Sequence, residues 1–234
     1  MKELLLGFMI IDLTHGLCED IPNWEGTNGF CEHIDVDYEH GARIMRYEMF
    51  AGIGTHMDAP GHYVKGAENI ADIEPEKLFV NACVINVSEQ AQDNSEYFLS
   101  VDEVKKWEER NGAIEKNSLF LVYTGWSKRW PDVQKYRNVG KDGKMHFPGM
   151  SAQVADFLLE RGVVAIGIDT LSPDGGDYTF PVHKKMLGAR KYMLENVAHL
   201  EKMPEIGAYV CVAPLKIKNG TESSVRLFGF VKKK

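Results

Sequence analysis

The sequence has few cysteines, and their spacing gives no metal knuckle and no redox pair. There are four among 234 residues, and no two of them form a CxxC motif. Cys83 and Cys211 lie inside apolar runs, where a small buried side chain is expected rather than a reactive thiol. We therefore expect reduced thiols, as in a cytoplasmic protein.

Long apolar runs and clusters of basic residues are also lacking. No stretch approaches the roughly eighteen apolar residues of a membrane-spanning helix, and no small-residue cleavage site follows the N-terminal apolar stretch. The formal net charge is -7, and the one basic run is Lys232 to Lys234. Phosphate binding needs clustered Lys and Arg. We therefore expect neither a nucleic acid nor a membrane as a partner.

What the sequence does contain is ordinary for a globular protein. Hydrophobic residues make up 44% and charged residues 26%, so neither disorder nor a fibrous class is indicated. The length suffices for a sizeable core, and we expect residues 1–234 to form one domain.

Apolar runs bounded by turn residues predict a series of strands. These runs are residues 4–13, 78–87, 119–123, 163–168, 208–213 and 225–231. Residues 42–50 mix apolar and charged positions, which predicts a further strand with one wetter face. Most of the other strands are expected to be buried.

Two helices are indicated by their capping residues. One covers residues 101–110, capped by Ser100 or Asp102, and the other covers 152–160 after Ser151. Gly112 and Gly162 are natural ends. Strands and helices alternate in the centre, which predicts an α/β or mixed architecture with antiparallel pairing at the strand-rich ends. Residues 126–150 lack periodicity and are expected to form a long loop, a frequent place for function.

The densest chemistry lies in residues 54–62, Gly-Thr-His-Met-Asp-Ala-Pro-Gly-His. Two imidazoles and a carboxylate, His56, Asp58 and His62, occupy a stretch in which Pro60 and two glycines exclude a regular helix. A single histidine there would more often be an ordinary polar residue. The combination of imidazole and carboxylate suits zinc, manganese or iron, so a metal site is predicted.

The same segment resembles the signature H-x-G-T-H-x-D-x-P-x-H of the cyclase family, which includes kynurenine formamidases and isatin hydrolases. The similarity continues along the chain at Asp12-Leu13-Thr14-His15 with Pro22 and Trp24, at Thr124-Gly125-Trp126, at residues 147–151, at residues 168–172, and at His183, Glu195, Asn196, Leu200 and Pro204. It implies the swivelling β/β/α fold, with a mixed sheet core and flanking helices, and a homodimer or larger homo-oligomer.

The resemblance also implies a set of ligands for one or two divalent ions, Zn²⁺ or Mn²⁺. The implied ligands are His56, Asp58, His62, His183 and Glu195. Asp58 would bridge the ions if two are bound. Without the resemblance, His183 would pass for a surface imidazole and Glu195 for a solvated carboxylate.

One position departs from the signature, because Gly52 stands where the first histidine is expected. Loss of a ligand weakens a metal site unless water or another side chain replaces it. Three outcomes follow, in the order in which we favour them. A mononuclear centre of Asp58, His62, His183 and Glu195 remains; or Glu48 or another donor substitutes, favouring a harder ion such as Mn²⁺; or activity is lost and binding is kept.

The function that the resemblance implies is hydrolysis of a C–N bond in a small, aromatic amide. A divalent ion acidifies water and polarises a carbonyl, and one of His62, His183 or Glu195 is expected to move the proton. Trp24 and Trp126 are candidates for an aromatic substrate pocket, which would suit N-formylkynurenine or a cyclic amide such as isatin.

Other classes of function are weaker interpretations of the same sequence. A noncatalytic metal-binding or small-molecule-binding protein is supported only by Gly52, and a structural interaction module leaves residues 54–62 without a role. Serine or cysteine hydrolysis lacks both a G-x-S-x-G motif and an activated cysteine. At Asp169 and Ser172 the sequence allows either orientation of a ligand imidazole or capping of the next turn.

Overall fold

The core of the protein is a mixed sheet that closes on itself in the computed structural model, which describes residues 7–233. Its eight strands, in spatial order, are β1 (Phe8–Asp12), β12 (Glu222–Lys232), β11 (Ala208–Pro214), β5 (Phe79–Asn86), β7 (Leu119–Tyr123), β9 (Ala165–Ile168), β10 (Tyr192–Glu195) and β4 (His56–Asp58). Strand β4 also pairs with β12, so the strands from β12 to β4 form a closed, barrel-like ring. Strands β5, β7, β9 and β10 run parallel and the other pairings are antiparallel.

The parallel strands are mostly apolar because most of their side chains are buried on both faces of the sheet. In β5, Val80, Ala82 and Val84 join the apolar cluster inside the ring, whereas Cys83 and Ile85 pack beneath the helices. This confirms the mixed α/β architecture expected from the alternating elements. The predicted first strand at 4–13 begins outside the described residues, and its described part is β1.

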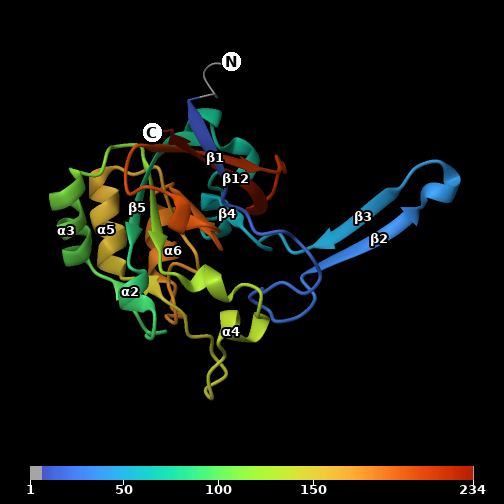
Figure 1. The fold of residues 1–234 in the computed structure, drawn as a ribbon, viewed down its shortest axis with the longest axis horizontal. Coiled ribbons are helices and arrows are strands. Elements are labelled where there is room, and N and C mark those ends of the chain that lie inside the picture. Colours follow the sequence, from blue (N-terminus) through green and yellow to red (C-terminus); the bar gives the residue numbers. More distant parts are fainter. Residues whose placement is uncertain (1–6, 234) are drawn as a thin grey trace.

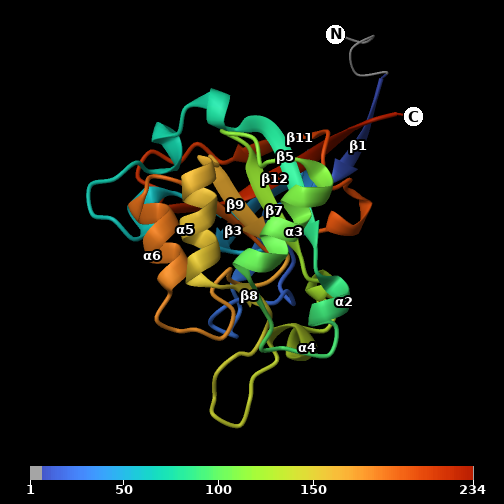
Figure 2. The same ribbon diagram turned by 90° about the vertical axis from the view of Figure 1, so that its left-hand side faces the viewer.

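Three helices cover the outer face of the parallel strands: α3 (Val101–Asn111), α5 (Ala152–Arg161) and α6 (Pro181–Gly188) (Figure 2). Helix α3 begins after Ser100, whose backbone N–H donates to Glu103 Oε2 at 2.9 Å in a capping box. The indole N–H of Trp107 donates to the carbonyl of Val84 at 2.9 Å, which ties α3 to β5. Helix α5 ends at Gly162, whose φ of 73° is left-handed. Both predicted helices are confirmed.

A hairpin of β2 (Phe30–Val36) and β3 (Ile44–Met49) extends away from the rest of the protein (Figure 1). The short 3-10 helix η1 (Tyr38–His40) lies between its strands. The predicted strand at 42–50 is confirmed, but both of its faces are open rather than one, because no other element of residues 7–233 covers it. Its exposed side chains include Ile34, Ile44 and Tyr47.

The remaining elements are short and connect the sheet to its loops. They are α2 (Ser88–Ala91), α4 (Val133–Arg137), the parallel pair β6 (Phe98–Leu99) and β8 (Gly149–Met150), and the 3-10 helices η2 (Pro60–His62), η3 (Ile70–Asp72), η4 (Pro75–Lys77), η5 (Trp126–Arg129) and η6 (Leu200–Lys202). The predicted loop at 126–150 is thus mostly irregular, with η5 and α4 inside it. No helix among residues 7–233 has the length and apolarity needed to cross a membrane.

Candidate metal centre

Strand β4 places its two polar side chains at the point where three strands meet. His56 and Asp58 are two positions apart and therefore share one face of the strand, while Met57 is fully buried on the other. The register sets Glu195 of β10 opposite His56, and Glu222 of β12 opposite Asp58. Directly opposed residues in antiparallel strands are close neighbours, so the register gathers three carboxylates around one imidazole.

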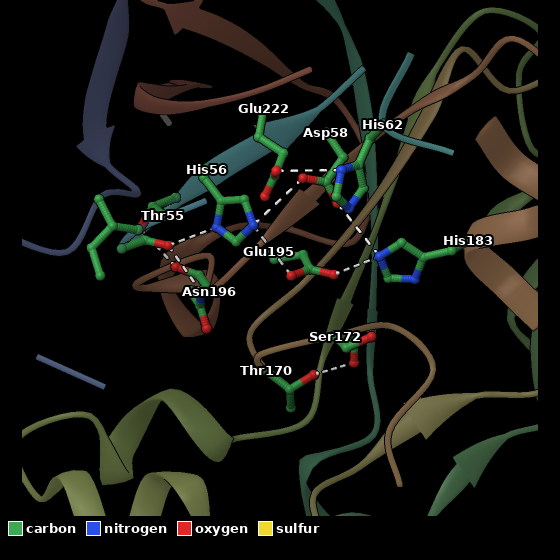
Figure 3. A network of polar contacts seen from close by, with 12 residues as sticks. Thr55, His56, Asp58, His62, Thr170, Ser172, His183, Glu195, Asn196 and Glu222 are labelled. Carbon is green, nitrogen blue, oxygen red and sulfur yellow. Dashed lines mark hydrogen bonds and ion pairs between the residues drawn. The ribbon is translucent and has the colours of Figure 1, made fainter. Parts of the chain in front are cut away.

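Two of these carboxylates connect His56 to a second imidazole, His183 of α6 (Figure 3). Asp58 places Oδ1 at 3.5 Å from Nε2 of His56 and Oδ2 at 3.5 Å from Nε2 of His183. Glu195 repeats the pattern, with Oε2 and Oε1 each 3.3 Å from the same two nitrogens. All four residues are buried. The arrangement has two halves that share two carboxylates.

Hydrogen bonds at Nδ1 orient both imidazole rings. The Nδ1–H of His56 donates to the carbonyl of Gly54 at 2.9 Å, and the Nδ1–H of His183 donates to Oδ2 of Asp174. Asp174 also accepts the backbone N–H of Val182 at 2.6 Å, at the start of α6. Such bonds fix the tautomer and leave Nε2 free. In both rings the free nitrogen faces Asp58 and Glu195.

The carboxylates of the site shift the pKa values of its two buried histidines. Burial lowers the pKa of His56, but Glu195 and Asp58 outweigh it and raise the pKa to about 9. Burial also lowers the pKa of His183, but Asp174, Asp58 and Glu195 outweigh it and raise that pKa far above its usual value. Burial raises the pKa of Asp58, but His183 and His56 bring it below its usual value. The residues hold positive charge strongly, so a cation would bind here by displacing protons.

The buried oxygens also lack hydrogen-bond donors. Oδ1 of Asp58 and Oε1 of Glu195 are buried without a hydrogen-bond partner, and such an oxygen is costly unless a cation or a donor satisfies it. Two groups of potential ligand atoms, each within 4.8 Å of one another, are present: Asp58, His62 and His183, and His56, Asp58 and Glu222. The residues therefore fit one or two divalent ions.

His62 and Glu222 form the more open side of the cluster. His62 ends η2, and its side chain is 30% exposed. Its Nδ1 lies 3.3 Å from Oε2 of Glu222. Burial and the charge of Asp58 raise the pKa of Glu222. No regular α-helix forms at residues 54–62, as the sequence predicts: His56–Asp58 form a paired strand, and Pro60–His62 form a single 3-10 turn.

A cavity of about 310 Å³ opens directly onto these side chains. Trp24, Tyr63, Leu171 and Phe180 form its apolar wall. Trp24 was predicted to contact substrate and lies in this wall. Trp126, also predicted there, is 2% exposed, packs with the core cluster of Tyr136 and Phe147, and is not among the residues that line the cavity. Its indole N–H instead donates to the carbonyl of Tyr136 at 2.8 Å.

Two groups near the site differ from the sequence-based expectation. Asp169 accepts hydrogen bonds from Thr124 and Ser127, so it holds the loop that follows the neighbouring strand β7 rather than an imidazole. Asp174 orients His183 and was missed, because nothing in its local sequence distinguishes it from a turn residue. Glu222 was missed for a similar reason, since only the pairing of β12 with β4 brings it to Asp58.

Comparison with known proteins identifies the family. A family model described as putative cyclase matches residues 11–175. The chain belongs to the cyclase family. Among curated members, it is similar to the isatin hydrolase of Roseibium aggregatum, at 30% identity over 77% of this chain and 72% of that protein. It is also similar to a kynurenine formamidase of Bacillus cereus, at 26% identity over 92% and 94% of the two chains.

The cyclase fold is shared with solved structures. Isatin hydrolase A from Labrenzia aggregata, bound to benzyl benzoate, superposes with a TM-score of 0.92 at 31% identity and covers 99% of both chains. Isatin hydrolase A from Ralstonia solanacearum gives the same TM-score at 29% identity, over 99% of this chain and 97% of the other. The fold that the family resemblance predicts is therefore confirmed.

Proposed function

We propose that this protein is a metal-dependent hydrolase that cleaves a C–N bond in a small, aromatic amide. The observation that carries the proposal is the pair of buried carboxylates, Asp58 and Glu195, that face two oriented imidazoles at the floor of an aromatic-walled cavity. The names of the similar proteins, isatin hydrolase and kynurenine formamidase, support the same chemistry.

The ligand set selects ions that accept both nitrogen and oxygen donors, such as Zn²⁺ or Mn²⁺. Such an ion supplies a nucleophile at neutral pH by acidifying water, and it polarises the carbonyl that is attacked. His56, Asp58, His183 and Glu195 are buried and hold the cation. The low exposure of these four groups strengthens their interaction with it.

His62 is the residue we assign to proton transfer. Its ring lies at the cavity wall, and it is more exposed than the side chains of His56 and His183, which are each 6% exposed. A neutral imidazole can accept a proton from water and deliver it to the departing nitrogen. His62→Ala is expected to lower kcat at least a hundredfold and to remove one limb of the pH–rate profile. An unchanged profile in both His62→Ala and His183→Ala would exclude histidine as the proton carrier.

A flat ring is the substrate shape that fits the cavity wall. Trp24 lies 5.7 Å from Phe180, centroid to centroid, and both line the cavity, which makes an apolar surface suited to aromatic stacking. N-formylkynurenine is our first candidate. Isatin, a cyclic amide, is the second, because the isatin hydrolases superpose with TM-scores of 0.92.

The test is hydrolysis of both compounds by protein loaded with Zn²⁺ or Mn²⁺, with metal content measured on the same sample. Trp24→Ala is expected to raise KM at least tenfold, whereas Trp126→Phe, which changes a core residue, should leave KM within twofold. A preparation that binds the ion but cleaves neither an arylformamide nor a cyclic amide would identify a noncatalytic binding protein.

We further propose that the protein acts in the cytoplasm as a homodimer or larger homo-oligomer. The projecting hairpin supports self-association, because it carries exposed Ile34, Ile44 and Tyr47 on an arm that no part of the described chain covers. Light scattering of the purified protein would show a single 26.4 kDa chain if this is incorrect.

A further inference from the structure

We infer that Glu222 is a metal ligand that takes the place of the side chain missing at position 52. The inference rests on the metal centre of the proposed function and adds a ligand to it. It concerns the half of the centre built on His56, where the family signature has a histidine and this chain has Gly52.

The space next to Gly52 is filled by the carboxylate of Glu222. A Cβ atom at position 52 would collide with Oε1 of Glu222, and it would lie 3.2 Å from Nε2 of His56. Any longer side chain leaving position 52 in that direction would have to pass through the same carboxylate. A ligand at 52 and the observed Glu222 are therefore alternative occupants of one place.

The backbone holds Glu222 in this position from a distant part of the chain. Glu222 is the first residue of β12 and pairs with Asp58, while Ser224 pairs with His56. Glu222 lies on the same side as Asp58, and one of its oxygens is within 4.8 Å of ligand atoms of His56 and Asp58. Figure 3 shows the carboxylate between His56 and His62.

The partners of Glu222 leave one oxygen for a cation. Among the described residues, its one ion pair is with His62, whose Nδ1 lies 3.3 Å from Oε2. No lysine or arginine of the described chain pairs with it. The neighbouring Oδ1 of Asp58, buried and without a hydrogen bond, is a second, independent sign that a cation belongs in this half of the cluster.

Glu48, the substitute first suggested by the sequence, lies elsewhere. Its side chain is 68% exposed on the β2–β3 hairpin, and it pairs with Arg46 at 2.8 Å. Of the two glutamates, only Glu222 belongs to a group of potential ligand atoms.

Exchange of an imidazole for a carboxylate changes the ion that this half prefers. The donors become one nitrogen and carboxylate oxygens, and the ligand set gains one negative charge. Oxygen-rich sets favour harder ions such as Mn²⁺ over the softer Zn²⁺. The chain is thus expected to discriminate against Zn²⁺ more strongly than a protein with histidine at this position.

The test compares Glu222→Gln with Glu48→Gln, which removes one carboxylate of equal size outside the cluster. Apo-protein is equilibrated with Mn²⁺, bound ion is counted by plasma mass spectrometry, and Kd is measured by competition with a chelator. Glu222→Gln is expected to lose one equivalent of Mn²⁺, or to bind it at least tenfold more weakly. Glu48→Gln is expected to match wild type. Equal stoichiometry and a Kd within twofold of wild type in Glu222→Gln would overturn the inference.

A double variant tests the reverse exchange, of the carboxylate for an imidazole. It remains a test if Glu222→Gln alone fails to fold. Gly52→His with Glu222→Gly removes the carboxylate and installs an imidazole in the vacated space. Its affinity for Zn²⁺ relative to Mn²⁺ is expected to rise at least tenfold over wild type. An unchanged ratio would overturn the inference.

These measurements distinguish a failure of the Glu222 inference from a failure of the proposed hydrolase function. Wild-type protein that binds ions through Glu222 but cleaves no amide leaves the inference intact and removes the proposed function. Hydrolysis that persists while Glu222→Gln binds metal normally does the opposite. Wild-type protein that binds no divalent ion removes both.

Discussion

Asp174 determines the orientation of one ligand through two kinds of hydrogen bond. Its carboxylate accepts the backbone N–H groups of Val182 and His183, at 2.6 and 3.2 Å, as well as the ring N–H of His183. The same side chain therefore positions the start of α6 and the imidazole that α6 carries. A residue that does not line the cavity thus orients one of the candidate ligands.

Asp174→Asn is expected to weaken metal binding about 10- to 100-fold, the usual effect of losing a carboxylate behind a ligand histidine. The amide can still accept a backbone N–H, but it no longer stabilises the His183 tautomer with a charge. Chelator competition measures the change. Asp177→Asn, in the same loop and bonded to Thr179, is the control and should behave as wild type. An equal effect of both variants would indicate a general change in the loop.

His15 gives the protein a pH-dependent term in its stability. Its ring stacks on Trp130 with centroids 3.9 Å apart, and its Nε2 is buried without a hydrogen bond. Burial, followed by the charge of His199, lowers the pKa of His15 to about 4. In the unfolded chain, His15 binds a proton near its ordinary pKa of 6.5, whereas in the folded protein it stays neutral down to about pH 4. The contribution of His15 to the free energy of unfolding is therefore fully present above pH 6.5 and is lost as the pH falls toward 4.

For His15→Gln we expect the decrease in unfolding free energy between pH 7 and pH 4.5 to be smaller than in wild type, by at most about 3 kcal/mol. Denaturant unfolding of metal-free protein at the two pH values measures it. His40→Gln, an exposed histidine of the hairpin, is the control. Parallel pH dependences in wild type and His15→Gln would contradict the assignment.

At the level of elements, the three-residue strand β4 assembles the centre. It pairs with β10 on one side and β12 on the other, so each of its residues faces a residue from each neighbour. A shift of one residue in either pairing would turn Glu195 or Glu222 to the opposite face of the sheet. The metal centre therefore depends on the closure of the ring.

The β2–β3 hairpin is expected to serve assembly rather than the fold of the ring. Residues His33 and Arg46 face each other in its register, so an Asn-Gly turn can replace residues 34–45 while keeping the base of the hairpin. The shortened protein should keep its circular dichroism spectrum and change from an oligomer to a monomer in light scattering. An unchanged mass would show that the hairpin is not the assembly surface.

At the scale of the whole molecule, the metal centre links regions far apart in sequence, from β4 to α6, β10 and β12. We propose that residues 1–234 unfold as one domain, since β1 and β12, near the two ends, are paired. A ligand that binds only the folded state stabilises it by about 2.7 kcal/mol at a concentration of 100 Kd.

Removal of the ion by a chelator is therefore expected to lower the thermal midpoint by about 5 to 10 °C, given a shift of about 2 to 4 °C per kcal/mol for a chain of this size. Differential scanning calorimetry with and without Mn²⁺ measures the change. Mg²⁺, which prefers all-oxygen sites, is the control ion. Equal midpoints in all three samples would show that no cation binds the native state.

Local patterns were enough to predict many of the longer elements and part of the site. Strands at 78–87 and 119–123 and both capped helices follow from apolar runs and capping residues that act within a few positions. His56, Asp58 and His62 lie close together in the sequence, so a metal site could be predicted from their spacing alone. His183 and Glu195 were assigned only through the family resemblance, because they lie more than a hundred residues away.

The sequence by itself thus determined seven strands, two helices and the first three candidate ligands, since these depend on neighbouring residues. Only the tertiary structure decided that Asp174 orients His183, that Trp126 is core, and that Glu222 fills the space beside Gly52. These relations depend on strand register and on packing between remote segments. A spacing along the chain cannot encode a distance across a sheet, because that distance exists only after the ring has closed.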